Sequence, residues 1–244
     1  MITLPAQPNQ SLIDGIAVLQ ELSRRGRPTS GLELARDLHL EKTRVNRLLK
    51  TLAFLGLTKT AAGRKYVCGD GIHILAAQSL YASGLLPVAM PLLTGLQRYG
   101  YIVALGVLWR DKTSYLYHHN PIHQELIAGL GGMGSFPVGE SSIGMVLLAQ
   151  KSEEEVRELY GANGIEGFAG TRRQLHTRLA RIRREGYADI YTDHHSLAVP
   201  LGTPPFAALA LSGSIPDDRI SEFVTILQQT ATQIEEGLHA YHRT

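Results

Sequence analysis

The sequence predicts an α+β fold in which a small winged helix-turn-helix unit precedes a larger mixed unit. Three observations predict this class. Residues 11–68 contain three apolar patterns of helical period, followed by two strand-like runs around a short turn. Beyond residue 84, strand-like runs are mixed with helical patterns, and the chain closes on a helix. A hydrophobic content of 44% is enough for a core and excludes general disorder.

The first unit is expected at residues 11–70, after a flexible tail at 1–10 that carries two prolines. Ser30 and Glu33 match a capping box, in which a serine and a glutamate satisfy amide groups at the start of a helix. A glycine at position 56 ends the third helical pattern. The expected elements, in order, are helices at 11–24, 30–38 and 40–55 and strands at 57–60 and 64–67.

The second unit is expected at residues 84–244, and a linker helix at 71–83 joins it to the first. Its mixture of helical patterns and apolar strand-like runs is typical of an α+β sensor domain. The expected helices lie at 85–99, 142–150, 153–160, 171–185 and 216–242, and the expected strands at 101–109, 113–119, 125–130, 196–201 and 206–212.

Several classes of protein are disfavoured by composition. No apolar run approaches the roughly 18–20 residues that a membrane-spanning helix needs. The start MITLPAQPNQ lacks the basic cluster and apolar stretch of a secretory signal. The single cysteine, Cys68, cannot form an internal disulfide. We therefore expect a cytoplasmic protein with no membrane partner and no cofactor.

Residues 42–52 place cations on one side of a helix. At 100° per residue, Val45, Leu48, Leu49 and Leu52 form an apolar stripe that faces the core. The opposite side and its margins carry Lys42, Thr43, Arg44, Asn46, Arg47 and Lys50. Lysine and arginine suit phosphates and guanine edges, asparagine suits adenine, and threonine suits phosphate or a thymine methyl group. This mixture predicts a recognition helix in the major groove of double-stranded DNA.

Two further observations bear on DNA binding. Arg64 and Lys65 lie beside the tip of the expected hairpin, where a wing would meet the DNA backbone or minor groove. Residues 1–70 hold eleven Lys and Arg against six Asp and Glu, whereas the remainder holds thirteen against sixteen. Positive charge gathered in one compact segment favours contact with a polyanion. A face that serves only solubility is the alternative, although no acidic residue interrupts it between Lys42 and Lys50.

The N-terminal unit resembles the DNA-binding module of IclR-type bacterial transcription regulators. A G-R-P turn at 26–28 precedes the pattern K-[ST]-x-V-x-R-L-L-x-T-L at 42–52, and L-G-L follows at 55–57. Further matching segments follow in order at 84–86, 136–138, 141–149, 183–187, 198–201 and 208–213, so the resemblance covers nearly the whole chain.

The resemblance implies a winged helix-turn-helix joined by a linker helix to a GAF-like (profilin-like) domain that binds a small effector. It further implies a homodimer or tetramer on pseudo-palindromic operator DNA, acting as the repressor of a catabolic operon. The implied effector contacts are Gly134, Ser141, Ser142, Ile143, His194, His195, Ser196 and Ser212. Ser141 and Ser142 can also cap a helix whose amide groups suit a carboxylate or hydroxyl. The alternative is that these serines serve structure alone.

The sequence departs from the family pattern around this pocket. Ser135, Gly139 and Met145 stand where the family commonly has a basic residue, a histidine and a lysine, and Glu140 adds a carboxylate. Fewer cations favour a neutral polyol-like or sugar-like effector, or one with an amine, over a simple organic acid.

Three other patterns suggest different chemistry. GLGGMG at 129–134 matches a dinucleotide motif, but the following Ser-Phe-Pro delays the helix such a site needs. GESSIG at 139–144, with Asp193 and His194, keeps a hydrolase or a small-molecule-binding protein with an incidental basic module as the alternative function. The histidines would bind zinc only if they converged, so no metal site is expected; they are His118, His119, His123, His194 and His195.

Overall fold

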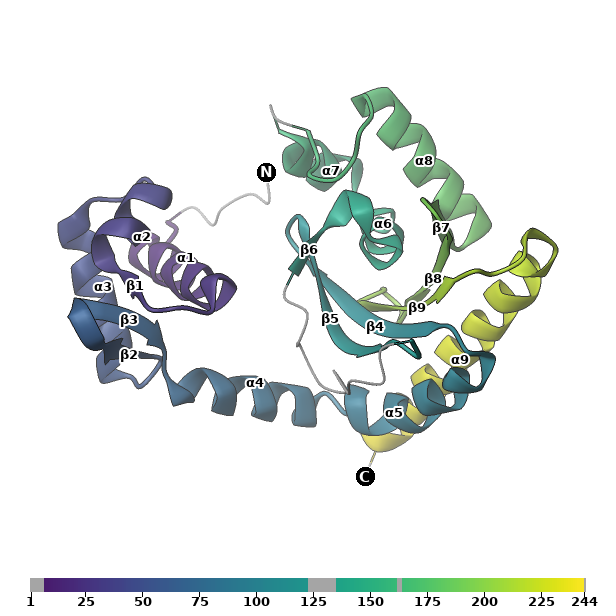
Figure 1. Cartoon of the computed structure of the whole chain (residues 1–244), viewed down its shortest axis with the longest axis horizontal. Helices are drawn as coiled ribbons and strands as arrows, with labels where there is room; N and C mark the ends of the chain where they lie inside the picture. The colour runs from purple at the N-terminus through teal and green to yellow at the C-terminus, as the bar shows by residue number, and fades with distance from the viewer. Residues whose placement is uncertain (1–6, 123–134, 162–163, 244) are drawn as a thin grey trace. The chain divides into compact units, whose positions relative to one another are not determined.

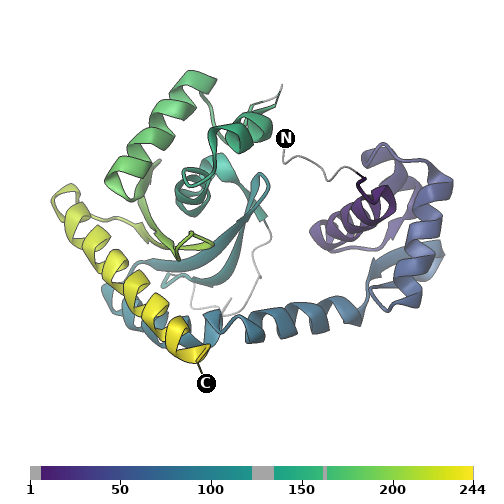
Figure 2. The same cartoon turned by 180° about the vertical axis from the view of Figure 1, so that it is seen from behind.

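The computed structural model describes residues 7–122, 135–161 and 164–243 (Figures 1 and 2). The chain divides into two compact units, one ending at Ser83 and the other starting at Gly84. Helices and antiparallel sheets occur in both units, which confirms the predicted α+β class. Among the described residues no single helix is long and apolar enough to cross a membrane, and only the broken pair Asp70–Ala82 and Leu85–Tyr99 passes such a test together.

The first unit contains the predicted three helices and hairpin. Its elements are α1 (Gln10–Arg25), β1 (Thr29–Ser30), α2 (Gly31–Asp37), α3 (Lys42–Phe54), β2 (Thr58–Ala61), β3 (Lys65–Cys68) and α4 (Asp70–Ala82). The strand order is β1-β3-β2, with antiparallel pairing throughout. The two-residue strand β1 was not expected, because so short a segment has no periodicity to read.

Local sequence signals explain where these helices begin. Ser30 caps α2, and both hydrogen bonds of the capping box with Glu33 are present. These bonds, together with nearby Arg27, lower the pKa of the Glu33 carboxyl to about 2. Apolar side chains from α1, α2 and α3 pack together in one core, and this packing determines which side of α3 faces outward. The core residues are Val18, Leu19, Leu22, Leu34, Ala35, Val45, Leu49 and Leu52.

The second unit is built on a six-stranded antiparallel sheet of order β6-β5-β4-β9-β8-β7. The strands are β4 (Ile102–Trp109), β5 (Lys112–His119), β6 (Ser135–Pro137), β7 (Ala188–Tyr191), β8 (His195–Leu201) and β9 (Ala207–Gly213). The helices are α5 (Leu85–Leu96), α6 (Ser142–Leu148), α7 (Glu153–Tyr160), α8 (Arg172–Glu185) and α9 (Ile220–Tyr241). The short strands β6 and β7 were not predicted, and the strand expected at 125–130 lies outside the described residues.

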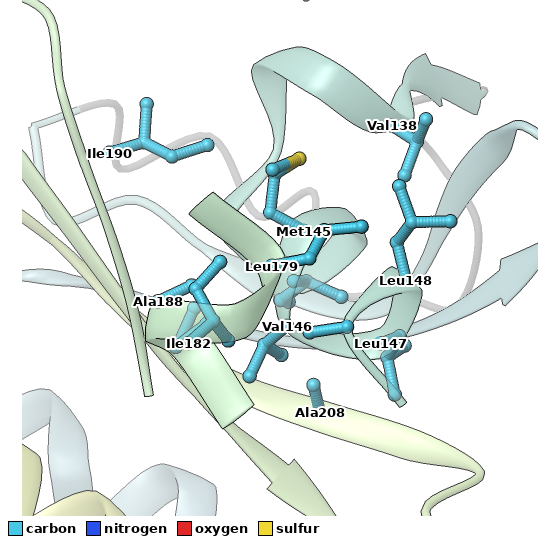
Figure 3. Close-up of a cluster of buried hydrophobic side chains, with 14 of the residues drawn as sticks. Val138, Met145, Val146, Leu147, Leu148, Leu179, Ile182, Ala188, Ile190 and Ala208 are labelled. Atoms are coloured by element: carbon cyan, nitrogen blue, oxygen red, sulfur yellow. The ribbon is translucent and has the colours of Figure 1, made fainter. Parts of the chain in front are cut away.

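Helices cover both faces of this sheet (Figures 1 and 2). Helices α5 and α9 contact each other and lie on one face, where α9 contacts β8 and β9. Helix α6 lies on the other face against β4, β8 and β9, with α8 beside it. Every residue of α6 is buried. Its apolar side chains pack with those of α8 and with small residues of the sheet, among them Ala188 and Ala208 (Figure 3). The buried α6 therefore holds its first residues, Ser142 and Ile143, against the sheet.

Candidate functional site

Helix α3 presents a cationic outer side. Val45, Leu49 and Leu52 are buried, as the apolar stripe predicts. Four residues of the opposite side are exposed; they are Lys42, Thr43, Arg47 and Lys50. No ion pair joins these three cations to a carboxylate among the described residues. Their charges are therefore available to an anionic partner such as DNA phosphate.

Arg44 differs from the other cations of α3. Its Nε lies 2.5 Å from Oδ2 of Asp14 on α1. The Asp14 side chain is 6% exposed, and its Oδ2 has no hydrogen-bond partner, so this ion pair is what compensates the buried charge. Arg44 thus ties α3 to α1, and part of its function is structural.

Asn46 also contacts its own unit. It is half-buried, and a Cβ added at Gly31 would lie 2.5 Å from its Oδ1. The amide therefore lies against the first residue of α2, where only glycine leaves room. This contact sets the approach of α2 to α3, the two helices of the helix-turn-helix.

The hairpin tip carries the other predicted DNA contacts. Arg64, just before β3, and Lys65, its first residue, are both exposed. Gly63 and Arg64 adopt the left-handed conformation, with φ of 70° and 56°. Glycine adopts this conformation at little cost, so Gly63 lets the chain turn tightly there. The turn presents both cations to solvent at one end of the small sheet.

In the second unit, three serine hydroxyls form a hydrogen-bonded chain. Oγ of Ser142, at the start of α6, lies 2.8 Å from Oγ of Ser196 on β8. Oγ of Ser196 lies 2.6 Å from Oγ of Ser212 on β9. Ser196 and Ser212 face each other in the strand register. The structure therefore brings together three of the residues predicted to contact an effector; we call them the serine chain.

The same sheet face carries two further polar side chains. Strand pairing places His118 opposite Ala104 and Tyr115 opposite Gly106, on the side that faces α6. Burial, and secondarily the charge of His119, lowers the pKa of His118. Burial raises the pKa of Tyr115, although a hydrogen bond with Ser141 opposes the rise. Both groups are therefore uncharged near neutral pH. The sequence had suggested His118 only as a metal ligand, and Tyr115 was not singled out.

The remaining predicted effector contacts are placed differently. Oγ of Ser141 accepts the N–H of Gly144 at 3.1 Å, so this serine caps α6. Ile143 is 1% exposed and belongs to the core. Nδ1 of His194 lies 2.8 Å from Asp193. Gly134 lies outside the described residues.

His195 lies away from the serine chain. It alternates along β8 with Ser196, which places its side chain on the opposite face of the sheet. Nδ1 lies 2.9 Å from Oδ2 of Asp189, and Nε2 lies 2.8 Å from Oδ1 of Asp217. Both ring nitrogens are thus occupied, so an effector would have to displace a carboxylate to reach them.

Other chemistry suggested by the sequence has no counterpart in the described residues. No group of three or more His, Cys, Asp or Glu side chains in the described part of the chain could hold a metal ion, and His123 lies outside that part. The described hydrogen bonds of Ser141 and Ser142 go to an amide and to other hydroxyls. The dinucleotide-like motif at 129–134 lies outside the described residues.

Comparison with known proteins finds relatives by sequence and by structure. No model of a protein family matches the chain. The transcriptional repressor IclR of Escherichia coli K12 is 26% identical over 245 residues, covering 92% of this chain and 88% of that protein. The structure of an IclR family transcriptional regulator from Brucella abortus superposes with a TM-score of 0.77 at 24% identity, covering 93% and 91% of the two chains.

A third relative was solved with a ligand. An IclR homologue from Microbacterium hydrocarbonoxydans, complexed with 4-hydroxybenzoate, superposes with a TM-score of 0.66 at 22% identity. The match covers 95% of this chain and 100% of the Microbacterium chain. These relatives match over most of both chains, and the two solved structures share the fold. In sequence and in fold the chain is similar over most of its length to the IclR-type transcriptional regulators, a family that is not enzymatic.

Proposed function

We propose that the chain is a repressor whose first unit binds operator DNA and whose second unit binds a small effector. The exposed cationic side of α3 supports this proposal most directly. In this assignment, residues 11–70 bind DNA, 71–83 form the connecting helix, and 84–244 bind the effector and a second copy.

The DNA contacts are assigned by exposure. Lys42, Thr43, Arg47 and Lys50 enter the major groove, because their side chains are free of the core. Arg64 and Lys65 approach the backbone or the minor groove from the wing. Arg44 and Asn46 remain candidates at the margin of this surface, but each also has a partner within the unit.

The apolar surface of α4 supports a homo-oligomer. No residue of this helix is buried. Its apolar side chains are exposed as well, by 57% for Ile74, 56% for Leu75 and 71% for Tyr81. Exposed apolar side chains along a helix are typical of a protein–protein interface. We assign this surface, in addition to residues 84–244, to contact with a second copy of the chain, because two copies match the two half-sites of a palindromic operator. Leu75→Lys should shift the dimer to the monomer in sedimentation, whereas Ala76→Lys, on the opposite side of the same helix, should not.

The serine chain supports a neutral effector. Serine hydroxyls, a tyrosine and an uncharged histidine offer donors and acceptors but no positive charge on the described face next to α6. An uncharged polyol or sugar can exchange hydrogen bonds with such hydroxyls, whereas a carboxylate needs a cation or several amide donors.

DNA binding is tested by anisotropy titration against the duplex that flanks the gene. The logarithm of affinity should fall linearly with the logarithm of salt concentration, because bound cations release counterions from DNA. Arg172→Ala, which removes an exposed cation of the second unit, should leave this binding unchanged. Absence of binding to any duplex at low salt would favour a small-molecule-binding protein with an incidental basic module.

Effector binding is tested by calorimetry with polyols, sugars and small acids, including 4-hydroxybenzoate. We expect neutral hydroxyl compounds to bind and to change affinity for the operator. Tight binding by simple acids alone would contradict the neutral assignment without affecting the DNA-binding role.

A further inference from the structure

A cavity of about 700 Å³ lies in the second unit, next to the serine chain. Its walls come from Gly139 and Glu140, from the loop at 167–170, from one side of α8, and from the end of β7. No serine of the serine chain lines it. Its volume is within the range of about 300–1,000 Å³ that small-molecule sites occupy.

Two loops form a rigid wall of this cavity. A Cβ added at Gly139 would lie 2.4 Å from the backbone N of Phe168, and one at Gly170 would lie 2.6 Å from its ring. The N–H of Gly139 donates to the carbonyl of Glu166 at 3.1 Å, and the Glu166 carboxylate pairs with Lys112. The two loops are therefore closely packed against each other, and such packing favours a pre-organised binding site.

One wall of the cavity carries hydrogen-bond donors, a guanidinium and an amide, and no carboxylate. Arg178 is half-buried and lies one turn after Gln174 on α8, so the two side chains are neighbours. Oε1 of Gln174 accepts the N–H of Thr171 at 2.7 Å, which leaves its Nε2 group as a donor. Arg181 pairs with Glu185, but the Arg178 guanidinium has no ion pair or hydrogen bond among the described residues. A guanidinium beside an amide donor is suited to a carboxylate.

Another wall offers the opposite charge. Glu140 lines the cavity, and its Cγ would lie 2.7 Å from a Cβ at Gly167, so its stem is held by the loop. Glu140 and Arg178 do not form an ion pair with each other in the described structure, although both line the same cavity. The cavity therefore holds separate positive and negative groups. Phe168 and Ile190 provide an apolar surface between them.

We propose that this cavity is a second ligand site, for a small zwitterion of the amino-acid class. The ligand carboxylate lies at Arg178 and Gln174, the ammonium group lies at Glu140, and the side chain lies on Phe168 and Ile190. Glu140 is two residues before Ser142, and Ile190 pairs with Ser196 across the sheet. A ligand in this cavity would therefore contact residues that are neighbours of Ser142 and Ser196 of the serine chain.

The test is calorimetry and thermal shift on the full chain with the common amino acids. At least one should bind once per chain, and its analogues lacking either the amino or the carboxyl group should bind at least about tenfold more weakly. Arg178→Gln and Glu140→Gln should each weaken binding by a similar factor. Arg172→Gln, on the same helix but outside the cavity, is the matched control and should bind normally.

Three outcomes would overturn the proposal. The first is that no amino acid produces heat or raises the melting temperature at millimolar concentration. The second is that binding is unchanged in both Arg178→Gln and Glu140→Gln while these variants melt as wild type. The third is that Ser196→Ala abolishes binding and Arg178→Gln does not, which would place the ligand at the serine chain. None of these outcomes depends on DNA binding, so the test is independent of the proposed repressor function.

Discussion

Nε2 of His195 lies 2.8 Å from Oδ1 of Asp217, and the ring thereby links β8 to the segment that leads into α9. Asp189 holds the other ring nitrogen at 2.9 Å, and the Tyr191 ring lies 4.8 Å away, centroid to centroid. Burial lowers the pKa of His195, but the hydrogen bonds and charges of Asp217 and Asp189 outweigh it, so the pKa is raised. The protonated ring can donate to both carboxylates at once.

This arrangement predicts that stability falls as pH rises. Because the pKa is raised in the folded state, its contribution is complete below the ordinary value of 6.5 and is lost as pH rises through the raised value. The melting temperature should fall as pH rises above about 6.5, and the fall should be smaller in high salt because the Asp217 side chain is 92% exposed. Differential scanning calorimetry measures both effects.

The control variants identify the responsible group. His195→Gln should flatten this part of the profile, whereas His176→Gln on α8 should keep its slope. A wild-type profile that is flat over this range, or one that His195→Gln leaves unaltered, would show that the pair of carboxylates does not stabilise the charged ring.

Arg44 and Arg47 should separate stability from DNA binding. Arg44→Ala leaves the buried Asp14 carboxylate without its cation, so we expect a loss of about 1–3 kcal/mol in the free energy of unfolding. Arg47→Ala removes an exposed side chain, so stability should change by less than about 0.5 kcal/mol. Urea unfolding measures this difference.

DNA binding should show the reverse order. Arg47→Ala should weaken specific binding by about 1–3 kcal/mol if Arg47 reads a base, or reduce the salt slope by about one if it contacts only phosphate. Under conditions where Arg44→Ala is still folded, its binding should be affected less. Unchanged binding by Arg47→Ala would contradict the assigned docking of α3.

The two arginines also mark what the sequence could and could not predict. A helical wheel correctly separated the buried and exposed sides of α3, because helix periodicity alone determines them. It could not distinguish Arg44 from Arg47, since the partner of Arg44 is on another helix. The same reason applies to His195, whose partner Asp217 is 22 residues later in the chain. Contacts between elements depend on packing, which spacing within one element does not encode.

The sheet shows the same division. Long apolar runs predicted β4, β5, β8 and β9, but β6 and β7 have only three and four residues and too little periodicity to detect. Resemblance to the family suggested Ser142, Ser196 and Ser212. Their direct hydrogen bonds follow from strand register and from the packing of α6, neither of which one sequence reveals.

Gly31 and Asn46 provide a test of helix packing. Alanine at position 31 would bring its Cβ to 2.5 Å from Oδ1 of Asn46, so either the Asn46 side chain must turn away or the two helices must shift. We expect Gly31→Ala to cost about 1–3 kcal/mol, as overpacked sites do. Adding Asn46→Ala should recover much of this loss, because the contacting amide is then absent. Urea unfolding of the two single variants and the double variant measures the coupling.

A matched control separates the clash from a general effect of replacing glycine. Gly95 on α5 has no atom within 4 Å of an added Cβ, so Gly95→Ala should be neutral or slightly stabilising. If Gly31→Ala were as stable as wild type, or if Asn46→Ala gave no recovery, the described contact between α2 and α3 would be incorrect.

Ser196 is the middle member of the serine chain, so its removal should affect both neighbours. Ser196→Ala leaves the hydroxyls of Ser142 and Ser212 without a common partner, and stability should fall by about 1 kcal/mol. If an effector exchanges hydrogen bonds with these hydroxyls, its affinity should fall by about tenfold or more, while affinity for DNA without effector stays unchanged. Calorimetry and DNA anisotropy on the same preparation measure the two effects. Ser214→Ala, which alters an exposed serine just beyond β9, should change neither. An effector response that survives intact in Ser196→Ala would mean that the serine chain only joins α6 to the sheet and that the effector binds elsewhere.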